Sequence, residues 1–174
     1  MLSLVLDSSA FIQGLDPQEE AAYTVPLVVE ELREGLTTAR LRSMEATGRL
    51  KVVEPVQRFL DVVEDESLRM GESHALSAAD KQVLALGLQL RDDDLEPVIV
   101  SDDYSVQNMA DALGLGHRGL ATPGIKRRFK WTLYCPGCRR EYPEPQPDDV
   151  CPVCGTDLKR KPVRKRKVTR RGGV

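Results

Sequence analysis

The chain has 174 residues, 41% of them hydrophobic and 30% charged, which suffices for one ordinary domain with a real core plus a small module. No apolar run approaches the roughly 18 residues of a membrane span, and the N-terminus lacks the pattern of a signal peptide, so we expect a cytoplasmic protein without membrane contact. Residues 1–125 carry a net charge of −12 (10 Lys and Arg, 22 Asp and Glu), and residues 126–174 a net charge of +10 (15 and 5).

The first 121 residues alternate short apolar runs with segments of helical spacing. Leu2 to Leu6 is typical of a buried strand, Pro26 is a favoured first helical residue, and Ser77 precedes Asp80 as in a capping box. The elements predicted in chain order are a strand at 2–6, a helix from 8, helices at 26–35 and 37–47, a strand at 50–53, helices at 56–70 and 77–90, a strand at 97–100, a helix at 104–113 and an edge strand at 116–121.

This alternation predicts the α/β class, with a three-layer domain and a mainly parallel sheet over residues 1–121. Open parallel sheets place their sites at the carboxyl ends of the strands. Asp7 follows the first predicted strand, and Asp102 and Asp103 follow the third. We therefore expect these acids at the same edge of the sheet.

Four acids are candidates for a metal-dependent catalytic site: Asp7, Glu31, Asp80 and Asp102. Hydrolysis of a phosphodiester needs an activated water and relief of charge on the phosphoryl oxygens, and Mg²⁺ or Mn²⁺ supplies both. Such cations take carboxylate oxygens as ligands. Each acid also has a simpler interpretation, since Asp7 and Asp102 could cap the helices that follow them, Asp80 could complement a helix dipole and Glu31 could lie on a solvated face.

All four cysteines lie in two CxxC pairs separated by 12 residues: Cys135, Cys138, Cys151 and Cys154. Two such pairs predict four thiolates arranged in a tetrahedron around one structural Zn²⁺. A redox dithiol and an iron ion in the same S₄ geometry are the alternatives. We expect a zinc ribbon over residues 131–158, whose folding depends on the metal because about 28 residues bury too little surface alone.

Basic residues flank this cysteine module. Residues 122–130 are predicted to form an exposed basic linker and residues 159–174 a disordered tail, since the tail holds nine Lys and Arg and no acid. Such charge attracts a phosphate backbone through counterion release. The candidate RNA-binding residues are Lys126, Arg127, Arg128, Lys130, Trp131, Arg139 and Arg140. Alternatively, Trp131 and Tyr134 pack over the cysteines, and the tail only aids solubility.

Four segments carry a resemblance to a known family. LVLDSSAFI, VPLVVEELRE, LSAADKQVLALG and VIVSDDYSVQNMA resemble the four acidic blocks of PIN-domain ribonucleases. With the zinc ribbon that follows, VVEELRE, LSAADKQVLAL and SDDYSVQN are similar to the NIN-one-binding protein family, which trims the 3′ end of small-subunit ribosomal RNA. Almost nothing is inserted between the blocks, so the chain looks like a compact archaeal member.

The resemblance implies a metal-dependent endoribonuclease that cleaves single-stranded precursor rRNA during ribosome assembly. It implies Mg²⁺ or Mn²⁺ bound by Asp7, Glu31, Asp80 and Asp102, with Ser101 orienting a ligand and Asp103 as a weaker candidate. The implied partners are precursor small-subunit rRNA, the pre-ribosomal particle and other assembly factors.

Three other functions stay open at this point. A non-catalytic zinc-ribbon assembly factor would bind RNA without cleaving it, and its acids would only cap helices. A toxin-like PIN nuclease on transfer or messenger RNA would need no basic module. A phosphatase or phosphoacceptor domain would want a DxD-like pair after the first strand, whereas Ser8 and Ser9 follow Asp7.

Overall fold

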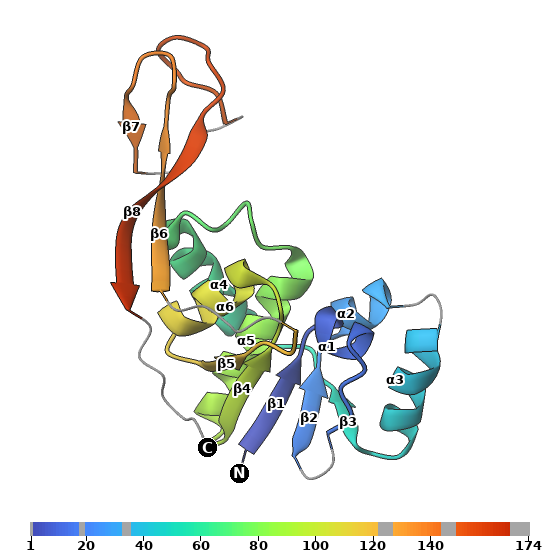
Figure 1. Cartoon of the computed structure of the whole chain (residues 1–174). Coiled ribbons are helices and arrows are strands. Elements are labelled where there is room, and N and C mark those ends of the chain that lie inside the picture. The colour runs from blue at the N-terminus through green and yellow to red at the C-terminus, as the bar shows by residue number, and fades with distance from the viewer. Residues whose placement is uncertain (1, 18–19, 33–35, 122–126, 144–148, 168–174) are drawn as a thin grey trace.

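The computed structural model describes residues 2–17, 20–32, 36–121, 127–143 and 149–167. The described residues up to 121 form an α/β body, and those from 127 to 167 form an antiparallel sheet, the stem, which extends from the body (Figure 1). Within these described ranges no helix is both long and apolar enough to cross a membrane.

The body contains a five-stranded sheet in which all paired neighbours are parallel, with the strand order β3-β2-β1-β4-β5. This confirms the predicted α/β class and the mainly parallel sheet. The strands are β1 (Leu2–Leu6), β2 (Ala21–Thr24), β3 (Leu50–Val52), β4 (Glu96–Val100) and β5 (Gly116–Arg118).

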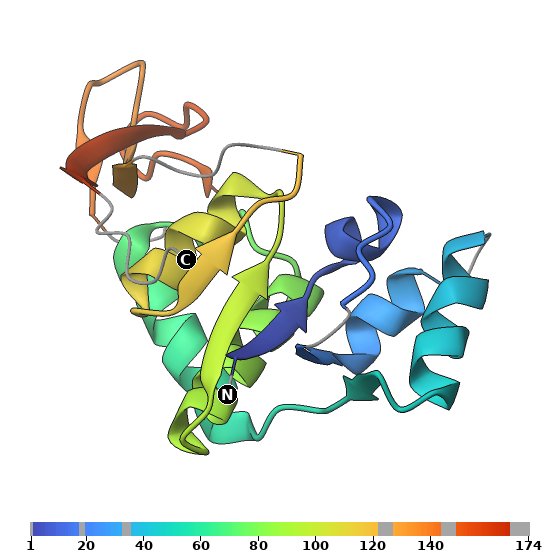
Figure 2. The same cartoon turned by 60° about the horizontal axis from the view of Figure 1, so that its bottom comes forward.

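Six helices connect the strands of the described body: α1 (Ser8–Ile12), α2 (Pro26–Glu31), α3 (Leu36–Ala46), α4 (Gln57–Met70), α5 (Ala78–Asp92) and α6 (Tyr104–Ala112). The chain moves outward from β1 to β3 and then returns past β1 to β4 and β5. Right-handed crossovers in opposite directions put helices on opposite faces. Accordingly α3 packs against β3, whereas α5 packs against β4 and β1 and α6 against β5 (Figure 2).

The reversal of strand order lies between β1 and β4, which are neighbours in the sheet. In open parallel sheets a crevice forms outside the carboxyl ends of the strands at this position. Asp7 follows β1, and Ser101 to Asp103 follow β4. The topology therefore brings together two acidic segments that are more than 90 residues apart in the chain.

The core of the body holds β1 and α5. Leu4, Val5 and Leu6 are fully buried, and α5 is buried on most of its surface. Gly87 allows the close packing of α5 on β4, because an added Cβ would lie 2.8 Å from Cδ1 of Ile99. The long apolar pattern at 77–90 therefore predicts a central helix correctly.

The stem consists of β6 (Arg127–Tyr134), β7 (Glu141–Tyr142) and β8 (Lys159–Lys167) in the order β7-β6-β8. The predicted linker (122–130) and tail (159–174) are wrong in part, because residues 127–130 and 159–167 are paired strands. Residues 122–126 and 168–174 lie outside the described residues. Charge composition favours an unpacked chain, but antiparallel pairing satisfies the backbone of both segments.

Candidate active site and cysteine cluster

Asp7 is the buried centre of the acidic site. Its side chain is 5% exposed and follows the last residue of β1. Oδ1 accepts a hydrogen bond from the Ser8 amide at 2.6 Å, and Oδ2 accepts from the Ser101 hydroxyl at 2.7 Å and from the Ser9 hydroxyl at 3.2 Å. These donors hold the carboxylate in one orientation.

Two serine hydroxyls also join the segments after β1 and β4. The Asp103 amide donates to Oγ of Ser101 at 3.1 Å, and the Asp102 amide donates to Oγ of Ser9 at the same distance. Ser101 thereby links Asp7 to the start of α6, as expected for a residue that orients a neighbouring ligand.

Glu31, at the end of α2, lies close enough to Asp7 and Asp80 for their charges to act on it. Its pKa is raised, first by partial burial and then by repulsion from these two carboxylates, while a hydrogen bond with Ser8 lowers it. Three of the predicted acids are therefore electrostatic neighbours in the folded chain.

Asp80 repeats this pattern from the first turn of α5. Burial raises its pKa, hydrogen bonds with Ser77 lower it, and the charges of Asp7 and Asp103 raise it again, with a net increase. Asp80 also forms a capping box, since its Oδ2 accepts from the Ser77 amide at 2.7 Å. Asp80 therefore both caps α5 and lies among the acids that repel each other.

The adjacent acids after β4 have different surroundings. Asp103 is the N-cap of α6, and its Oδ1 accepts from the Ser105 amide at 2.6 Å, so Asp103 rather than Asp102 is the helix cap. The Asp102 carboxylate accepts from the amides of Leu120 and Ala121 at 2.8 to 3.1 Å. The charge of Asp103 contributes to raising the pKa of Asp80.

The arrangement of the carboxylates suits a divalent cation that keeps several waters better than one whose ligands all come from the protein. In the described parts of the chain, the ligand atoms of four cysteines lie within 4.8 Å of one another, and no three acids are gathered as tightly. Mg²⁺ commonly keeps several waters and uses only one or two carboxylates. The oxygen donors and their mutual repulsion suit such an ion, which would relieve the raised pKa values.

The cysteine cluster is compact. Sγ of Cys135 lies 3.3 Å from that of Cys154, and Sγ of Cys138 lies 3.6 Å from that of Cys151. A tetrahedron with Zn–S bonds of about 2.3 Å has edges of about 3.8 Å, so these separations are near those of a ZnS₄ site. The four cysteines could therefore bind zinc, as predicted for a ribbon.

The two CxxC turns share one backbone geometry. The Cys135 amide donates to the Arg140 carbonyl at 2.8 Å, and the Cys151 amide donates to the Thr156 carbonyl at 2.9 Å. Arg139 and Gly155, the residues after the second cysteines, both have positive φ, 64° and 69°. Glycine adopts this conformation without strain, and arginine does not.

Hydrogen bonds adjust the thiol pKa values. The Tyr142 hydroxyl, 3.1 Å from Sγ of Cys151, lowers the pKa of that thiol to about 6. Hydrogen bonds with Thr156 lower the pKa of Cys154. The pKa of Cys138 is raised to about 11, because a backbone hydrogen bond with Arg140 lowers it less than burial and the other cysteines raise it. Two thiols are thus poised to become thiolates, the form that binds metal.

Those residues predicted to bind RNA that the structure describes lie along the stem, and they differ in surroundings. Lys130, Arg139 and Arg140 are exposed. Trp131 is half-buried against the body, where its indole N–H donates to Oε1 of Glu72 at 2.7 Å. Lys126 lies outside the described residues, and for Arg127 and Arg128 only the backbone in β6 is described.

The structure does not support the alternative that Trp131 and Tyr134 form the small core over the cysteines. The hydrophobic residues clustered with Cys135 and Cys151 are Leu133, Tyr142 and Leu158. Sequence reasoning also missed Glu72, because no motif marks a loop glutamate that becomes 2% exposed only when the stem packs on it. The alternation of Phe129, Trp131 and Leu133 is the signal that could have predicted β6.

Comparison with known proteins first identifies the class. Residues 4–90, half of the chain, match the family model of the PIN domain of ribonuclease. This match covers Asp7, Glu31 and Asp80, and the PIN nuclease fold implies the use of divalent metal ions.

Similarity to individual proteins identifies the family within this class. The chain is 44% identical over 165 residues to Endoribonuclease Nob1 of Pyrococcus abyssi, covering 95% of this chain and 97% of that protein. It is 39% identical to Endoribonuclease Nob1 of Methanothermobacter thermautotrophicus (90% and 91% covered) and 36% identical to that of Methanocaldococcus jannaschii (93% and 79%). The chain belongs to the Nob1 family of PIN-domain endoribonucleases.

Proposed function

We propose that the chain is a divalent-metal-dependent endoribonuclease that cleaves single-stranded precursor rRNA and matures the 3′ end of small-subunit rRNA. The endonuclease activity is supported by relatives named Endoribonuclease Nob1 that align over nearly their whole length. The substrate is the one that the sequence resemblance implies. The pre-ribosomal particle and other assembly factors are the partners that this role requires, and the cytoplasm is its expected location.

The single observation that carries this proposal is the mutual repulsion of acids from separate elements. Burial and the charges of Asp7 and Asp80 raise the pKa of Glu31, and burial and the charges of Asp7 and Asp103 raise that of Asp80. Helix capping does not require acids from separate elements to gather at the crevice between β1 and β4. Binding of cations and a phosphodiester does require several acids at one place.

A divalent cation bound at this site supplies an activated water and neutralises charge on the phosphoryl oxygens. Asp7 is held for this purpose by Ser8, Ser9 and Ser101. Ser101 acts as a positioning residue, since it aligns Asp7 and fixes the start of α6 through the Asp103 amide. The reaction needs no nucleophilic side chain from the protein.

The fourth carboxylate comes from the pair after β4. The sequence favours Asp102, but the contacts support Asp103, because its charge acts on Asp80 while the Asp102 carboxylate accepts from two amides of the 120–121 segment. Asp103→Asn should then reduce cleavage more than Asp102→Asn does. The reverse order would restore Asp102 as the ligand.

We further propose that the ion in the cysteine cluster is Zn²⁺ with a structural role. Four sulfur ligands close the coordination shell and leave no open position for chemistry. Metal analysis of the purified protein checks this, with one zinc per chain expected and iron as the contradicting result.

The deciding experiment compares cleavage of an RNA that spans the 3′ end of small-subunit rRNA, with and without Mn²⁺. Asp7→Asn should reduce cleavage by at least about 100-fold while leaving RNA affinity unchanged, because it removes charge from the centre of the site. Asp92→Asn is the matched control, since Asp92 is an exposed acid paired with Arg58 at the far end of α5.

The same experiment tests the non-catalytic alternative. If wild-type protein binds this RNA in a salt-sensitive manner but yields no Mn²⁺-dependent product, the chain is an RNA-binding assembly factor and the nuclease proposal fails.

A further inference from the structure

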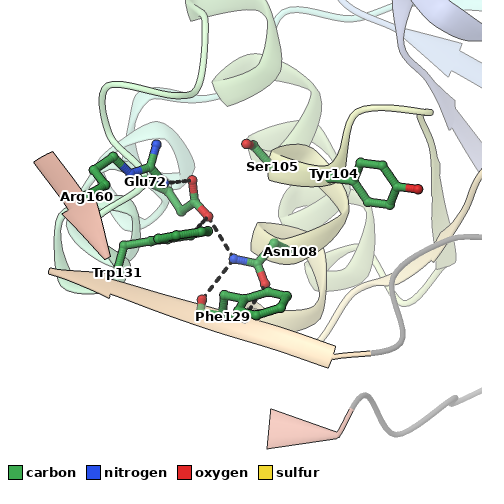
Figure 3. Close-up of a pocket in the computed structure, with 7 residues that line it drawn as sticks. All are labelled: Glu72, Tyr104, Ser105, Asn108, Phe129, Trp131 and Arg160. Carbon is green, nitrogen blue, oxygen red and sulfur yellow. Dashed lines mark hydrogen bonds and ion pairs between the residues drawn. The ribbon is translucent and has the colours of Figure 1, made fainter. Parts of the chain in front are cut away.

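A pocket of about 430 Å³ lies where the stem meets the body, outside the acidic site (Figure 3). The first turn of α6 forms one wall with Tyr104 and Ser105, and β6 forms another with Phe129 and Trp131. One wall is a helix of the body and the other is a strand of the stem. The pocket therefore exists only because the stem is held against the body.

Aromatic side chains dominate this pocket. The chain has only eight aromatic residues (3 Phe, 4 Tyr and 1 Trp), and three of them line it. The rings of Phe129 and Trp131 are stacked, with centroids 5.7 Å apart and an interplanar angle of 26°. Tyr104 is 55% exposed at the edge of the pocket, and its ring points away from this pair (Figure 3). A stacked pair such as Phe129 and Trp131 is a surface on which an unpaired base can stack.

The aromatic wall is held in place by polar contacts to the body. The Asn108 side chain binds both backbone groups of Phe129, since its Oδ1 accepts from the amide at 2.8 Å and its Nδ2 donates to the carbonyl at 2.9 Å. Glu72 accepts from the Trp131 indole at 2.7 Å and from Nδ2 of Asn108 at 2.9 Å. The rings are therefore organised before any ligand arrives, which lowers the entropic cost of binding.

The charge of Glu72 is neutralised inside the junction. Arg160 on β8 donates to its Oε2 at 2.9 Å, and the guanidinium group lies 4.8 Å from the centroid of the Trp131 ring. A buried ion pair adds little net stability compared with apolar packing. Its value here is geometric, because one carboxylate fixes the orientation of β6, of β8 and of the indole ring.

The surroundings of the pocket suit a nucleotide. Arg160, whose guanidinium group lies over the Trp131 ring, keeps about a third of its side chain exposed. Cations next to a ring face can contact phosphates while the ring stacks on a base. The pocket also adjoins the acidic site, because Tyr104 directly follows Asp103, whose charge acts on Asp80.

We propose that this pocket binds an unpaired base of the RNA strand, close to the phosphodiester that lies at the acidic site. This inference rests on the proposed RNA substrate, but it does not depend on cleavage. The body would supply the chemistry, and the pocket would select which phosphodiester is presented to it. The Phe129 and Trp131 pair stacks on the base, the exposed Tyr104 ring at the edge of the pocket makes a second contact with the RNA at this position, and Arg160 contacts a neighbouring phosphate.

The test measures RNA binding to the full-length, zinc-loaded protein in an Asp7→Asn background, so that the RNA stays intact. The probe is the rRNA 3′-end oligonucleotide, with a single abasic nucleotide moved through each position. At one position near the cleavage site, loss of the base should weaken binding about tenfold. In Phe129→Leu and in Tyr104→Ala the same abasic RNA should bind within about twofold of the intact RNA, because a ring in contact with the RNA at this position is gone.

Two controls separate stacking from a structural effect. Tyr104→Phe keeps the ring and should retain the full abasic penalty, and Val163→Ala truncates an exposed residue of β8 outside the pocket and should also retain it. If Phe129→Leu disturbs the junction, Tyr104→Ala decides the result, since this exposed side chain can be removed with little effect on folding.

The proposal is overturned if no position shows a penalty, or if the penalty is equal in the wild-type background and in both pocket variants. These outcomes differ from failure of the nuclease proposal, which concerns Mn²⁺-dependent product. If the protein does not cleave RNA but still shows a position-specific abasic penalty that the pocket variants remove, the pocket proposal stands and the nuclease proposal fails.

Discussion

The body and the stem contain opposite electrostatic problems. In the body, acids from α2, α5 and the segments after β1 and β4 converge at one crevice, where they repel each other. In the stem, basic residues occupy paired register positions of β6 and β8. These backbone pairs are Arg127 with Lys167, Arg128 with Arg166, and Lys130 with Arg164. Under the proposed function, divalent cations would offset the charge of the body and the phosphates of an RNA would offset that of the stem.

The two regions also differ in what stabilises them. The body buries a continuous core that includes β1 and α5, whereas the hydrophobic cluster of the stem centres on Leu158 and two buried cysteines. Hydrophobic burial can support the body alone, but so small a cluster needs metal or contact with the body.

Cys151→Ser should abolish zinc binding and unfold the ribbon, while the sheet of the body stays folded. Structural zinc supplies on the order of 10 kcal/mol to such modules. Amide hydrogen exchange measures the effect, with protection lost at 131–158 and kept in β1 and α5. Val153→Ser, an exposed change within the same CxxC turn, is the control that should keep zinc. A ribbon that stays protected without metal would contradict this view of the stem.

Glu72→Gln should destabilise the protein by about 2–3 kcal/mol, because it leaves Arg160 without its counter-charge and replaces one acceptor oxygen with an NH₂ group, which cannot accept from the donors of Trp131, Asn108 or Arg160. Thermal unfolding is the measurement.

Glu64→Gln is the matched change for this experiment. Glu64 pairs with Lys81 on an exposed surface of α4, where an ion pair contributes about 1 kcal/mol or less. If both variants lose the same stability, the junction between stem and body is not fixed by the buried carboxylate.

The metal-free body should become less stable as the pH rises above 4.5, the ordinary pKa of glutamate. Burial and neighbouring acids raise the pKa of Glu31 and of Asp80 in the folded state. The folded protein therefore binds protons more strongly than the unfolded chain, and this stabilisation is lost as pH rises through the raised pKa values. Added Mn²⁺ should increase the melting temperature more at neutral pH than at acidic pH.

Glu31→Gln refines this prediction, because it removes one of the repelling charges. It should stabilise the metal-free protein at neutral pH by about 0.5 kcal/mol or less and reduce the gain from Mn²⁺. Glu30→Gln, one residue earlier in α2, is the control. Equal pH profiles for the two variants would mean that Glu31 does not belong to the cation site.

Lys130→Ala should weaken RNA binding slightly and reduce the slope of log affinity against log salt by about 0.7, the value for one phosphate of a single strand. Lys51→Ala on β3 of the body serves as the control, since Lys51 is an exposed lysine far from the stem in sequence. An unchanged slope in Lys130→Ala would place the RNA elsewhere on the protein.

Local patterns in the sequence predict most of the body. The helices from Pro26 and over 77–90 and the strands at 2–6 and 97–100 are confirmed, because their periodicity and caps agree with their tertiary surroundings. β2 was missed, since Ala21–Thr24 is short and has no clear alternation. The four acids of the candidate site stay a prediction, although three of them are electrostatic neighbours in the structure.

Composition alone does not predict the secondary structure of the stem. The spacing of the cysteines predicts their cluster, because a tetrahedral S₄ site needs two tight turns, and local geometry provides them. The density of charge at 159–167 predicts disorder, yet this segment pairs with β6 along its whole length. Strand pairing is a long-range interaction, and composition holds no information about the partner.

The class of the body, the order of its main elements and the clustering of the four cysteines can be predicted from local sequence patterns, since each depends on residues close together in the chain. Three features depend on long-range contacts instead: which acid of the pair after β4 caps α6, how Trp131 is used and where the stem lies. Each of these depends on contacts such as that between Glu72 and Arg160, 88 residues apart. Such contacts form only when separate hydrophobic and polar surfaces meet, so short-range patterns do not encode them.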